Sequence, residues 1–400
     1  MTRANSTSIS RRTALRALVG ATAVGGAAGI AGADRNGPRA RFADDADDAG
    51  NADDADGDPP SDESPACDFG AVVEDAMDSI VTVRVFDQHQ REFVQGSGWV
   101  YDREDDGAVV ATNWHVIFGA VGADVRFGRG DWRPAGRLLG DDRYSDLAVL
   151  RIEDPPEYAE PLSIVDETPA QGDPVAALGA PIGLEGSLTT GVVSAVDRST
   201  TVAIEHLMYT VPSTIQMDAA TNPGNSGGPL LDCDGGVVGV NFAGTPPAVA
   251  ENINFAVSTT MIERIVPELV ETGRFAHPYV GIGGMTISPM LSRRNDLEET
   301  TEGVYVDVTV DGFPGELFLE GTSSVDRETG LPIGGDVIVA ADDVDVDGTD
   351  ALRNYLFEET APGETVAFTV LRGEDEHEIP VGLEARPEEL ERIDVREPTM

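Results

Sequence analysis

The sequence predicts a mainly β protein with two folded domains behind a long unstructured leader. From about residue 69, short runs rich in β-branched and aromatic residues, such as SIVTVRVF, GAVVATN and LAVLRI, alternate with glycine and acidic turns. Convincing helical periodicity is confined to TTMIERIVPELVETG and DALRNYLFEE. A chain of 400 residues is long for one domain and comfortable for two.

The N-terminus has the features of an export signal. Paired Arg11 and Arg12 precede a weakly hydrophobic run rich in glycine and alanine, and the AGA at 31–33 offers small residues for cleavage. The run is too short and too rich in glycine for a comfortable membrane span. We therefore predict a twin-arginine signal over 1–33. The mature protein is expected outside the cytoplasm, extracellular or at the cell surface, and tethered to the membrane if the signal is not cleaved.

The charge balance is strongly acidic. The chain has 72 acidic and 27 basic residues, a formal net charge of -45, and no lysine. Such a surface repels nucleic acid and anionic lipid. The composition favours a protein adapted to high salt, with an acidic secreted protein from an ordinary habitat as the alternative. Residues 34–68 form an acidic Asp/Ala/Gly/Pro segment that is predicted to be a solvated linker.

Folded structure is expected over 69–274 and 277–385, followed by a tail over 386–400. In the first domain, the helix at 259–273 carries an apolar stripe and ends at Gly273. The second domain has strands at YVGIGGMTI, GVYVDVTV, GDVIVAADDVDV, TVAFTVLR and HEIPVGL.

The two cysteines leave two possibilities. Cys67 stands at the start of the first domain and Cys233 follows a predicted strand in its middle. In an exported chain they could form a disulfide or remain as two thiols.

A candidate nucleophile lies in the stretch TNPGNSGGPLL. A serine hydroxyl is a poor nucleophile near neutral pH and needs a base, a group that orients the base, and donors for the developing oxyanion. The glycines around Ser226 let successive N–H groups turn toward a reacting carbonyl, and the amides of Gly224 and Ser226 are the expected donors. A simple turn is the alternative; a phosphate-binding loop is excluded because the Lys-Ser/Thr pair is absent.

The base and the orienting acid are expected at His115 and Asp146. His115 ends an apolar strand in VVATNWHVIFGA, and Asp146 leads into the apolar strand of RYSDLAVLRI. The chain order His, Asp, Ser matches chymotrypsin-like enzymes and differs from subtilisin and the α/β-hydrolases. The remaining histidines lie in polar or loop contexts and are expected to be ordinary surface residues: His89, His206, His277 and His377.

The motifs GSGWVYD, TNWHVI, DLAVLR, IQMDAATNPGNSGGPLLD and NFAVS together resemble the HtrA/Deg family of serine proteases, over roughly residues 70–385. The resemblance implies a chymotrypsin-like double β-barrel protease domain, built from two six-stranded barrels, followed by a PDZ domain. It further implies an ATP-independent endopeptidase of misfolded or regulatory proteins that needs no metal or other cofactor. A homotrimer or higher homo-oligomer is also expected from the family.

The resemblance assigns roles to individual residues. Ser226 would attack the carbonyl, His115 would move the proton, and Asp146 would hold the imidazole. Ala220 stands where a trypsin-like enzyme has an acid, so a small aliphatic side chain is the expected preference. An extended substrate would pair along the strand Phe255, Ala256 and Val257.

In the second domain, the resemblance points to a loop for the carboxylate of a peptide C-terminus, formed by Tyr279, Val280, Gly281 and Ile282. The peptide would add a strand beside this loop. The segment 311–339 is longer than in relatives, so the groove is expected to be rebuilt or partly closed. A chaperone without turnover, or a protease locked until a peptide occupies the PDZ domain, remains the alternative to a constitutively active enzyme.

Overall fold

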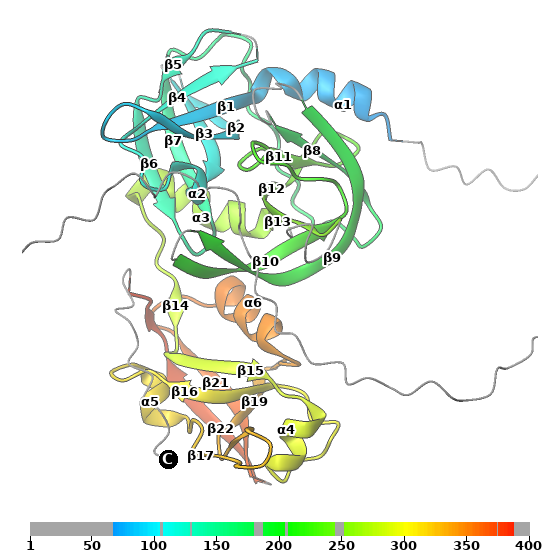
Figure 1. Ribbon diagram of the computed structural model, residues 1–400, viewed down its shortest axis with the longest axis vertical. Helices are drawn as coiled ribbons and strands as arrows, with labels where there is room; N and C mark the ends of the chain where they lie inside the picture. The colour runs from blue at the N-terminus through cyan, green and yellow to red at the C-terminus, as the bar shows by residue number, and fades with distance from the viewer. Residues whose placement is uncertain are drawn as a thin grey trace, which may run out of the picture.

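The computed structural model describes residues 67–104, 107–128, 130–179, 187–204, 207–244, 252–373 and 375–387. The expected export signal, the acidic linker up to residue 66, His206 and the tail beyond residue 387 lie outside the described residues. The chain forms two domains, one above the other in Figure 1. Across the part of the chain that is described, no helix is long and apolar enough to cross a membrane.

The N-terminal domain begins with α1 (Phe69–Ala76) and a short 3-10 turn, η1 (Met77–Ser79), followed by an antiparallel sheet. Its strands are β1 (Ile80–Phe86), β2 (Glu92–Glu104), β3 (Gly107–Asn113), β4 (Gly122–Phe127), β5 (Arg133–Pro134), β6 (Arg137–Asp142) and β7 (Leu147–Glu153). They lie in the order β5-β4-β1-β2-β3-β7-β6. The short helix α2 (Trp114–Ile117) follows β3.

The second sheet of this domain is a closed barrel of six strands in the order β10-β13-β12-β11-β8-β9. Its strands are β8 (Pro174–Gly179), β9 (Ser187–Ile204), β10 (Leu207–Met217), β11 (Pro229–Leu231), β12 (Val237–Gly244) and β13 (Asn254–Ser258). The mainly β fold is confirmed. The expectation of two six-stranded barrels holds for this sheet, whereas the first sheet has seven strands because the two-residue β5 adds to its edge.

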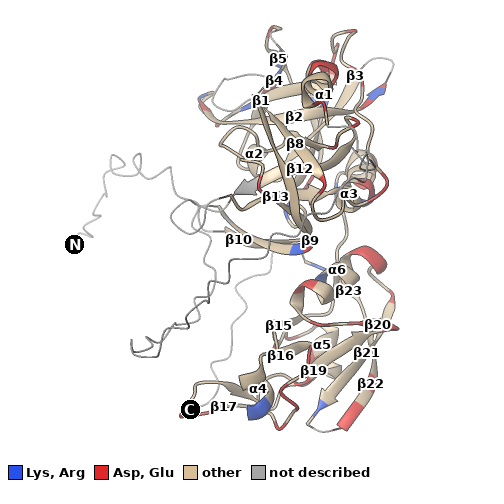
Figure 2. Ribbon diagram, turned by 90° about the vertical axis from the view of Figure 1, so that its right-hand side faces the viewer, with Lys and Arg blue, Asp and Glu red and all other residues tan. Residues whose placement is uncertain are grey.

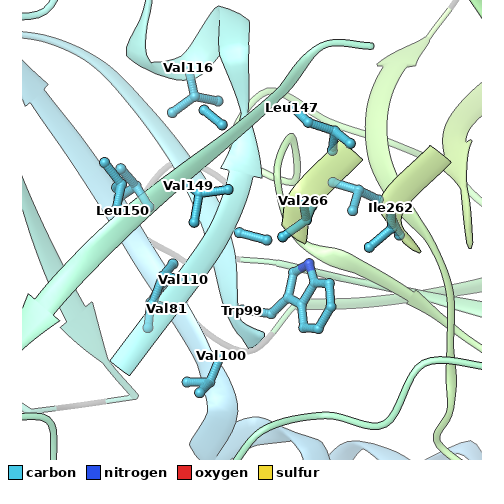
Figure 3. Close-up of a cluster of buried hydrophobic side chains, with 14 of the residues drawn as sticks. Val81, Trp99, Val100, Val110, Val116, Leu147, Val149, Leu150, Ile262 and Val266 are labelled. Atoms are coloured by element: carbon cyan, nitrogen blue, oxygen red, sulfur yellow. The ribbon is translucent and has the colours of Figure 1, made fainter. Parts of the chain in front are cut away.

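Helix α3 (Thr259–Thr272) follows β13 and packs against β6 and β7. Its apolar stripe contributes Ile262 and Val266 to the core, where they lie near the fully buried Trp99 (Figure 3). Pro267 is accommodated inside the helix. The helix ends as predicted at Gly273, which adopts φ 83 and donates its N–H to Leu269 O.

The structure joins Cys67 to Cys233 by a disulfide across 166 residues of sequence. The bond ties the segment just before α1 to the loop between β11 and β12. Of the two possibilities that the sequence leaves open, the structure contains the disulfide.

The C-terminal domain is a sheet in the order β15-β16-β19-β21-β22, flanked by helices. Its strands are β15 (Ile282–Thr286), β16 (Val304–Thr309), β19 (Val337–Ala341), β21 (Thr365–Arg372) and β22 (Asp375–Gly382), with β20 (Val344–Asp345) on β19. Two further pairs are β14 (Pro278–Tyr279) with β23 (Glu384–Ala385), and β17 (Ser324–Val325) with β18 (Pro332–Ile333). The helices are α4 (Pro289–Arg294), α5 (Pro314–Phe318) and α6 (Thr349–Glu359).

The long segment 311–339 folds into α5, the β17–β18 hairpin and the start of β19. None of its residues lines the groove between β15 and α6. The extra length therefore adds no residue to the lining of this groove, although its Phe313 packs against Tyr279 with ring centroids 4.9 Å apart.

Direct hydrogen bonds join the two domains. Helix α6 lies below β9 and β10 (Figure 1), and Asn354 accepts from the Ser213 N–H at 2.9 Å and donates to Asp197 O at 2.9 Å. The Ser213 hydroxyl donates to Glu358 Oε1 at 2.5 Å. His277, expected at the surface, is instead buried on the linker, where its Nε2 lies 2.9 Å from both carboxylate oxygens of Asp142. Acidic segments are distributed over both domains (Figure 2).

Candidate active site

Ser226 lies on a tight loop between β10 and β11. Gly224 and Gly227 adopt φ 110 and 87, which glycine tolerates at little cost. A Cβ at Gly227 would lie 2.1 Å from Ser97 O. Ser97 also holds the loop by two hydrogen bonds, from its N–H to Ser226 O at 2.7 Å and from its hydroxyl to Gly224 O at 2.6 Å. The loop is thereby fixed against β2, in the other sheet of the domain.

The expected base and acid are in contact. His115 is the second residue of helix α2, which follows β3 directly. Its Nδ1 lies 2.7 Å from Asp146 Oδ2. The His115 backbone N–H donates to Asp146 Oδ1 at 2.9 Å. With Nδ1 engaged by a carboxylate, the proton belongs on Nδ1, and Nε2 is left as the acceptor.

Asp146 is held from several sides. It is fully buried and adopts φ 57, a left-handed conformation that aspartate tolerates better than most residues. Its carbonyl accepts from Asn113 Nδ2 at 2.9 Å and from the Trp114 N–H at 3.0 Å. The turn that leads into it is closed by Asp142, whose Oδ2 accepts from the Ser145 N–H at 2.9 Å.

Tyr209 is a further partner of the acid, and the sequence reasoning missed it. Its hydroxyl donates to Asp146 Oδ1 at 3.2 Å, and its ring packs edge-on against Trp114 at 5.4 Å between centroids. Burial, the negative charge of Asp146 and this hydrogen bond raise the pKa of Tyr209 far above its usual range. The phenol therefore remains a neutral donor. No sequence signal marks it, since a tyrosine on a strand is ordinary.

The helix of His115 and the loop of Ser226 both approach Gly96 on β2. A Cβ at Gly96 would lie 2.7 Å from Val116, the neighbour of His115, and 3.1 Å from Ser226 O. The Ser226 hydroxyl donates to Phe242 O at 3.4 Å. Among the hydrogen bonds of the described residues, none joins this hydroxyl to His115. The arrangement thus has the imidazole and carboxylate engaged, with the hydroxyl turned toward β12.

The amides around Ser226 divide into two groups. Three of the N–H groups are engaged within the protein: Asn225 donates to Asn222 O, Gly227 to Asn241 O and Gly228 to Asn225 O. Within the described ranges, no hydrogen bond uses the N–H groups of Gly224 and Ser226. These two amides are therefore free to receive an oxyanion from a substrate.

Ala220 is exposed and lies six residues before Ser226 in the chain. Its carbonyl accepts from Thr189 Oγ1 at 2.7 Å. Two aromatic rings on β12 and β13, Phe242 and Phe255, are 6.4 Å apart between centroids.

The expected pairing of substrate along Phe255, Ala256 and Val257 does not fit the structure. Strand β13 pairs with β10 on one edge and with β12 on the other, so the barrel occupies both edges of its backbone. Ala256 and Val257 are also fully buried. Among the described residues, a free edge lies instead on β12. This strand pairs with β11 only up to Val240, which leaves residues 242–244 without a described strand partner on that side, where Phe242 O accepts from the Ser226 hydroxyl.

Comparison with known proteins places the chain in a family. A model of the trypsin-like peptidase domain matches residues 96–240. "Putative serine protease HhoA" of Synechocystis sp. is 33% identical over 288 residues, which cover 70% of this chain and 68% of that protein. The chain belongs to the HtrA/Deg family of serine proteases.

Other HtrA/Deg members show the extent of the likeness. "Serine protease Do-like HtrA" of Bacillus subtilis is 31% identical over 302 residues, and the chain spans 64% of its length. The solved structure "HtrA-type protease AlgW with tripeptide" has a TM-score of 0.62 at 26% identity and covers 80% of this chain and 97% of its own. The structural likeness therefore extends over both domains.

The C-terminal domain of this HtrA/Deg chain contains a cavity of about 380 Å³ between β15, α6 and β10. Tyr279, Val280, Gly281 and Ile282 all line it. Gly281 has φ 81, and a Cβ there would lie 2.2 Å from Phe313. The carbonyls of Val280 and Gly281 accept from the Gly315 and Val310 N–H groups at 2.7 and 2.8 Å, which fixes the shape of the loop.

Proposed function

We propose that this chain is an exported, ATP-independent serine endopeptidase of misfolded or regulatory proteins. The observation that carries the proposal is the His115–Asp146 contact of 2.7 Å beside the glycine loop of Ser226, with two unused amides on that loop.

In the proposed reaction, Ser226 Oγ attacks the scissile carbonyl while His115 Nε2 takes its proton and later returns it to the leaving amine. Asp146 keeps the other imidazole proton on Nδ1 and stabilises the imidazolium. The amides of Gly224 and Ser226 receive the oxyanion. Water then hydrolyses the acyl-enzyme. The Ser226 hydroxyl must first rotate away from Phe242 O toward His115.

Substrate recognition is proposed at the free edge of β12. An extended peptide would pair with residues 242–244, and its side chain before the scissile bond would enter toward Ala220. Since Ala220 carries no charge, a small aliphatic side chain is favoured over a basic one.

A second candidate is a protease that a peptide activates, and the position of the Ser226 hydroxyl favours it. The hydroxyl donates to Phe242 O, so the three proposed catalytic groups are not all engaged. The activating peptide would bind its C-terminal carboxylate at Tyr279–Ile282, in the manner of a PDZ domain, and add a strand to β15. Strand β15 stands at the edge of its sheet and can accept one.

We further propose that the chain is exported by a twin-arginine signal, which the sequence at 1–33 supports. The net charge of -45 without lysine supports activity in high salt. Membership of the family supports assembly into a homotrimer or larger homo-oligomer.

The test is digestion of an unfolded model protein by residues 34–400 in molar salt, beside the Ser226→Ala variant. Cleavage by the parent chain and not by the variant is the expected result, and the fragment ends report the preferred side chain. If neither folded chain cleaves, even with C-terminal peptides added, the chain acts as a binding protein or chaperone and the endopeptidase proposal is wrong.

A further inference from the structure

Two arginine side chains line the groove of the C-terminal domain. Arg353 on α6 and Arg386 after β23 both line the cavity that contains the Tyr279–Ile282 loop. Arg386 stacks over the Tyr144 ring at 3.7 Å and lies 5.5 Å from the Tyr279 ring centroid. One cation therefore stands beside the first residue of the loop, and the other stands on the helix that forms the opposite wall.

The positive charge of these arginines is poorly compensated. The Arg386 Nε is buried and has no hydrogen-bond partner, and no ion pair among the described residues involves its guanidinium. Arg353 has Asp350 Oδ1 at 3.8 Å, a long contact between two half-exposed side chains. In a chain with 72 acidic residues, a cation without a close carboxylate is unexpected.

The two arginines also act on each other. Burial lowers the pKa of Arg353, and the nearby positive charge of Arg386 lowers it further, against the opposing effect of Asp350. Two like charges that share a partly desolvated cavity are relieved by an anion placed between them.

A further wall of the cavity comes from β10 of the N-terminal domain and is apolar at its rim. Met208 on β10 lines the cavity with 67% of its surface exposed, and Pro212 lies on the same strand. A flexible thioether at this place adapts to varied apolar side chains. The cavity thus combines apolar contacts with a cationic centre, which fits a peptide that carries an acidic side chain among apolar ones.

We propose that Arg353 and Arg386 form a subsite for an acidic side chain close to the C-terminus of the bound peptide. This inference rests on the proposed peptide-binding role of the groove. The terminal carboxylate is taken by the loop amides, so the arginine pair selects a second negative charge within the three residues that precede the last one.

The sign of the effect distinguishes this subsite from general electrostatics. A surface with net charge -45 attracts basic peptides and repels acidic ones. General electrostatics therefore predicts that a peptide with Lys binds more tightly than one with Gln, and the Gln peptide more tightly than one with Glu. Molar salt would reduce these differences in affinity, because the Debye length falls to about 3 Å. The subsite predicts the reverse order, retained in molar salt because partly buried charges are screened less.

The experiment measures fluorescence anisotropy of fluorescein-labelled decapeptides that end in an apolar residue. Glu, Gln or Lys is placed in turn at each of the three positions before the last. The protein is residues 34–400 with Ser226→Ala, which prevents cleavage and makes binding independent of the proposed catalysis. At one position, the Glu peptide should bind about tenfold tighter than its Gln counterpart. Equal affinities at all three positions overturn the subsite but leave the groove as a peptide site.

The variants Arg353→Gln and Arg386→Gln should each reduce the Glu preference to near unity without changing the affinity for the Gln peptide. Arg327→Gln, on the β17–β18 hairpin away from the cavity, removes the same charge and should keep the preference. If Arg386→Gln fails to fold, Arg353→Gln on the exposed face of α6 still decides the question. A preference unchanged in Arg353→Gln overturns the proposal. Absence of binding by any peptide overturns both the groove and its subsite, whereas the digestion experiment tests the endopeptidase separately.

Discussion

The buried carboxylate of Asp142 accepts the Nε2–H of His277 at 2.9 Å, and this contact joins the turn that carries Asp146 directly to the start of the C-terminal domain. The same carboxylate closes the turn by accepting from the Ser145 N–H. A single side chain thus sets the position of the proposed catalytic acid and anchors the domain linker.

Replacing Asp142 by alanine should lower the free energy of unfolding by about 3 kcal/mol, because it leaves the buried His277 without its partner. Proteolysis should fall as well, since the Asp146 turn loses its closure. Urea unfolding and the rate of model-protein digestion measure the two effects. Glu299→Gln, which removes an exposed acid on the C-terminal domain, is the control and should change neither. A fully stable Asp142→Ala chain would contradict the anchoring role.

Acid should weaken the same contact. Burial raises the pKa of Asp142, but the attraction of His277 and the hydrogen bonds from His277 and Ser145 outweigh it and leave the pKa below the usual 3.8. A carboxylate with a lowered pKa stabilises the fold above 3.8, and this contribution is lost as the pH falls through the folded-state value. Unfolding free energy measured from about pH 5 to about pH 2 should therefore fall less in Asp142→Asn than in the parent chain. Parallel curves would show that Asp142 does not contribute.

Removal of the Tyr209 hydroxyl should slow catalysis without unfolding the protein. Tyr209→Phe keeps the packing against Trp114 but deprives Asp146 Oδ1 of one donor. A hydrogen bond to a charged group contributes roughly 1.5–3 kcal/mol, so kcat/KM should fall roughly ten- to a hundredfold. Tyr158→Phe, on the surface, should behave like the parent chain; equal rates in the two variants would exclude the role of Tyr209.

The disulfide should contribute substantially to stability. Linking Cys67 to Cys233 closes a loop of 166 residues, and a native disulfide of this kind typically contributes about 2–4 kcal/mol. The double variant Cys67→Ser with Cys233→Ser should therefore unfold at lower urea concentration, and reductant should shift the parent chain in the same direction. Reductant should have no effect on the double variant. Identical midpoints for the oxidised and reduced parent would contradict the prediction.

Two glycines with positive φ provide a matched pair for the loop of Ser226. Gly227 and Gly172 adopt φ 87 and 99, respectively. A Cβ at Gly227 would lie 2.1 Å from Ser97 O, whereas a Cβ at Gly172 would have no atom within 4 Å. Gly172→Ala should therefore carry only the backbone strain, about 1 kcal/mol. Gly227→Ala should in addition displace the loop and abolish cleavage. Retained activity in Gly227→Ala would mean that the loop adapts and that its tight approach to β2 is not needed.

The sequence was informative where function leaves a local pattern. The sequence motifs themselves predict the order of His115, Asp146 and Ser226. The glycines around the serine and the C-cap at Gly273 are likewise predicted from a few adjacent residues. The pairing of β13 and the hydrogen bond of Tyr209 depend on which strands meet in the closed barrel. Such contacts between distant segments leave no periodic signal, so the substrate edge was assigned to the wrong strand.

Other features depend on side-chain direction or on very short elements. Nothing in GNSGGP distinguishes a Ser226 hydroxyl that donates to Phe242 O from one that donates to His115. The five-residue α5 and the two-residue β5 are too short for hydrophobic periodicity to reveal. Their formation depends on packing with the surrounding domain.

The closure of the barrel around β13 limits what can be cut. With both edges of β13 used, the backbone beside Ser226 that remains open is the short stretch at the end of β12. A polypeptide can pair there only if several consecutive residues have released their own backbone partners. Native proteins rarely offer such a stretch, whereas a chain that has lost its structure offers many. For the proposed endopeptidase, selection of damaged targets would then need no recognition of damage itself, because an intact fold keeps its own backbone occupied.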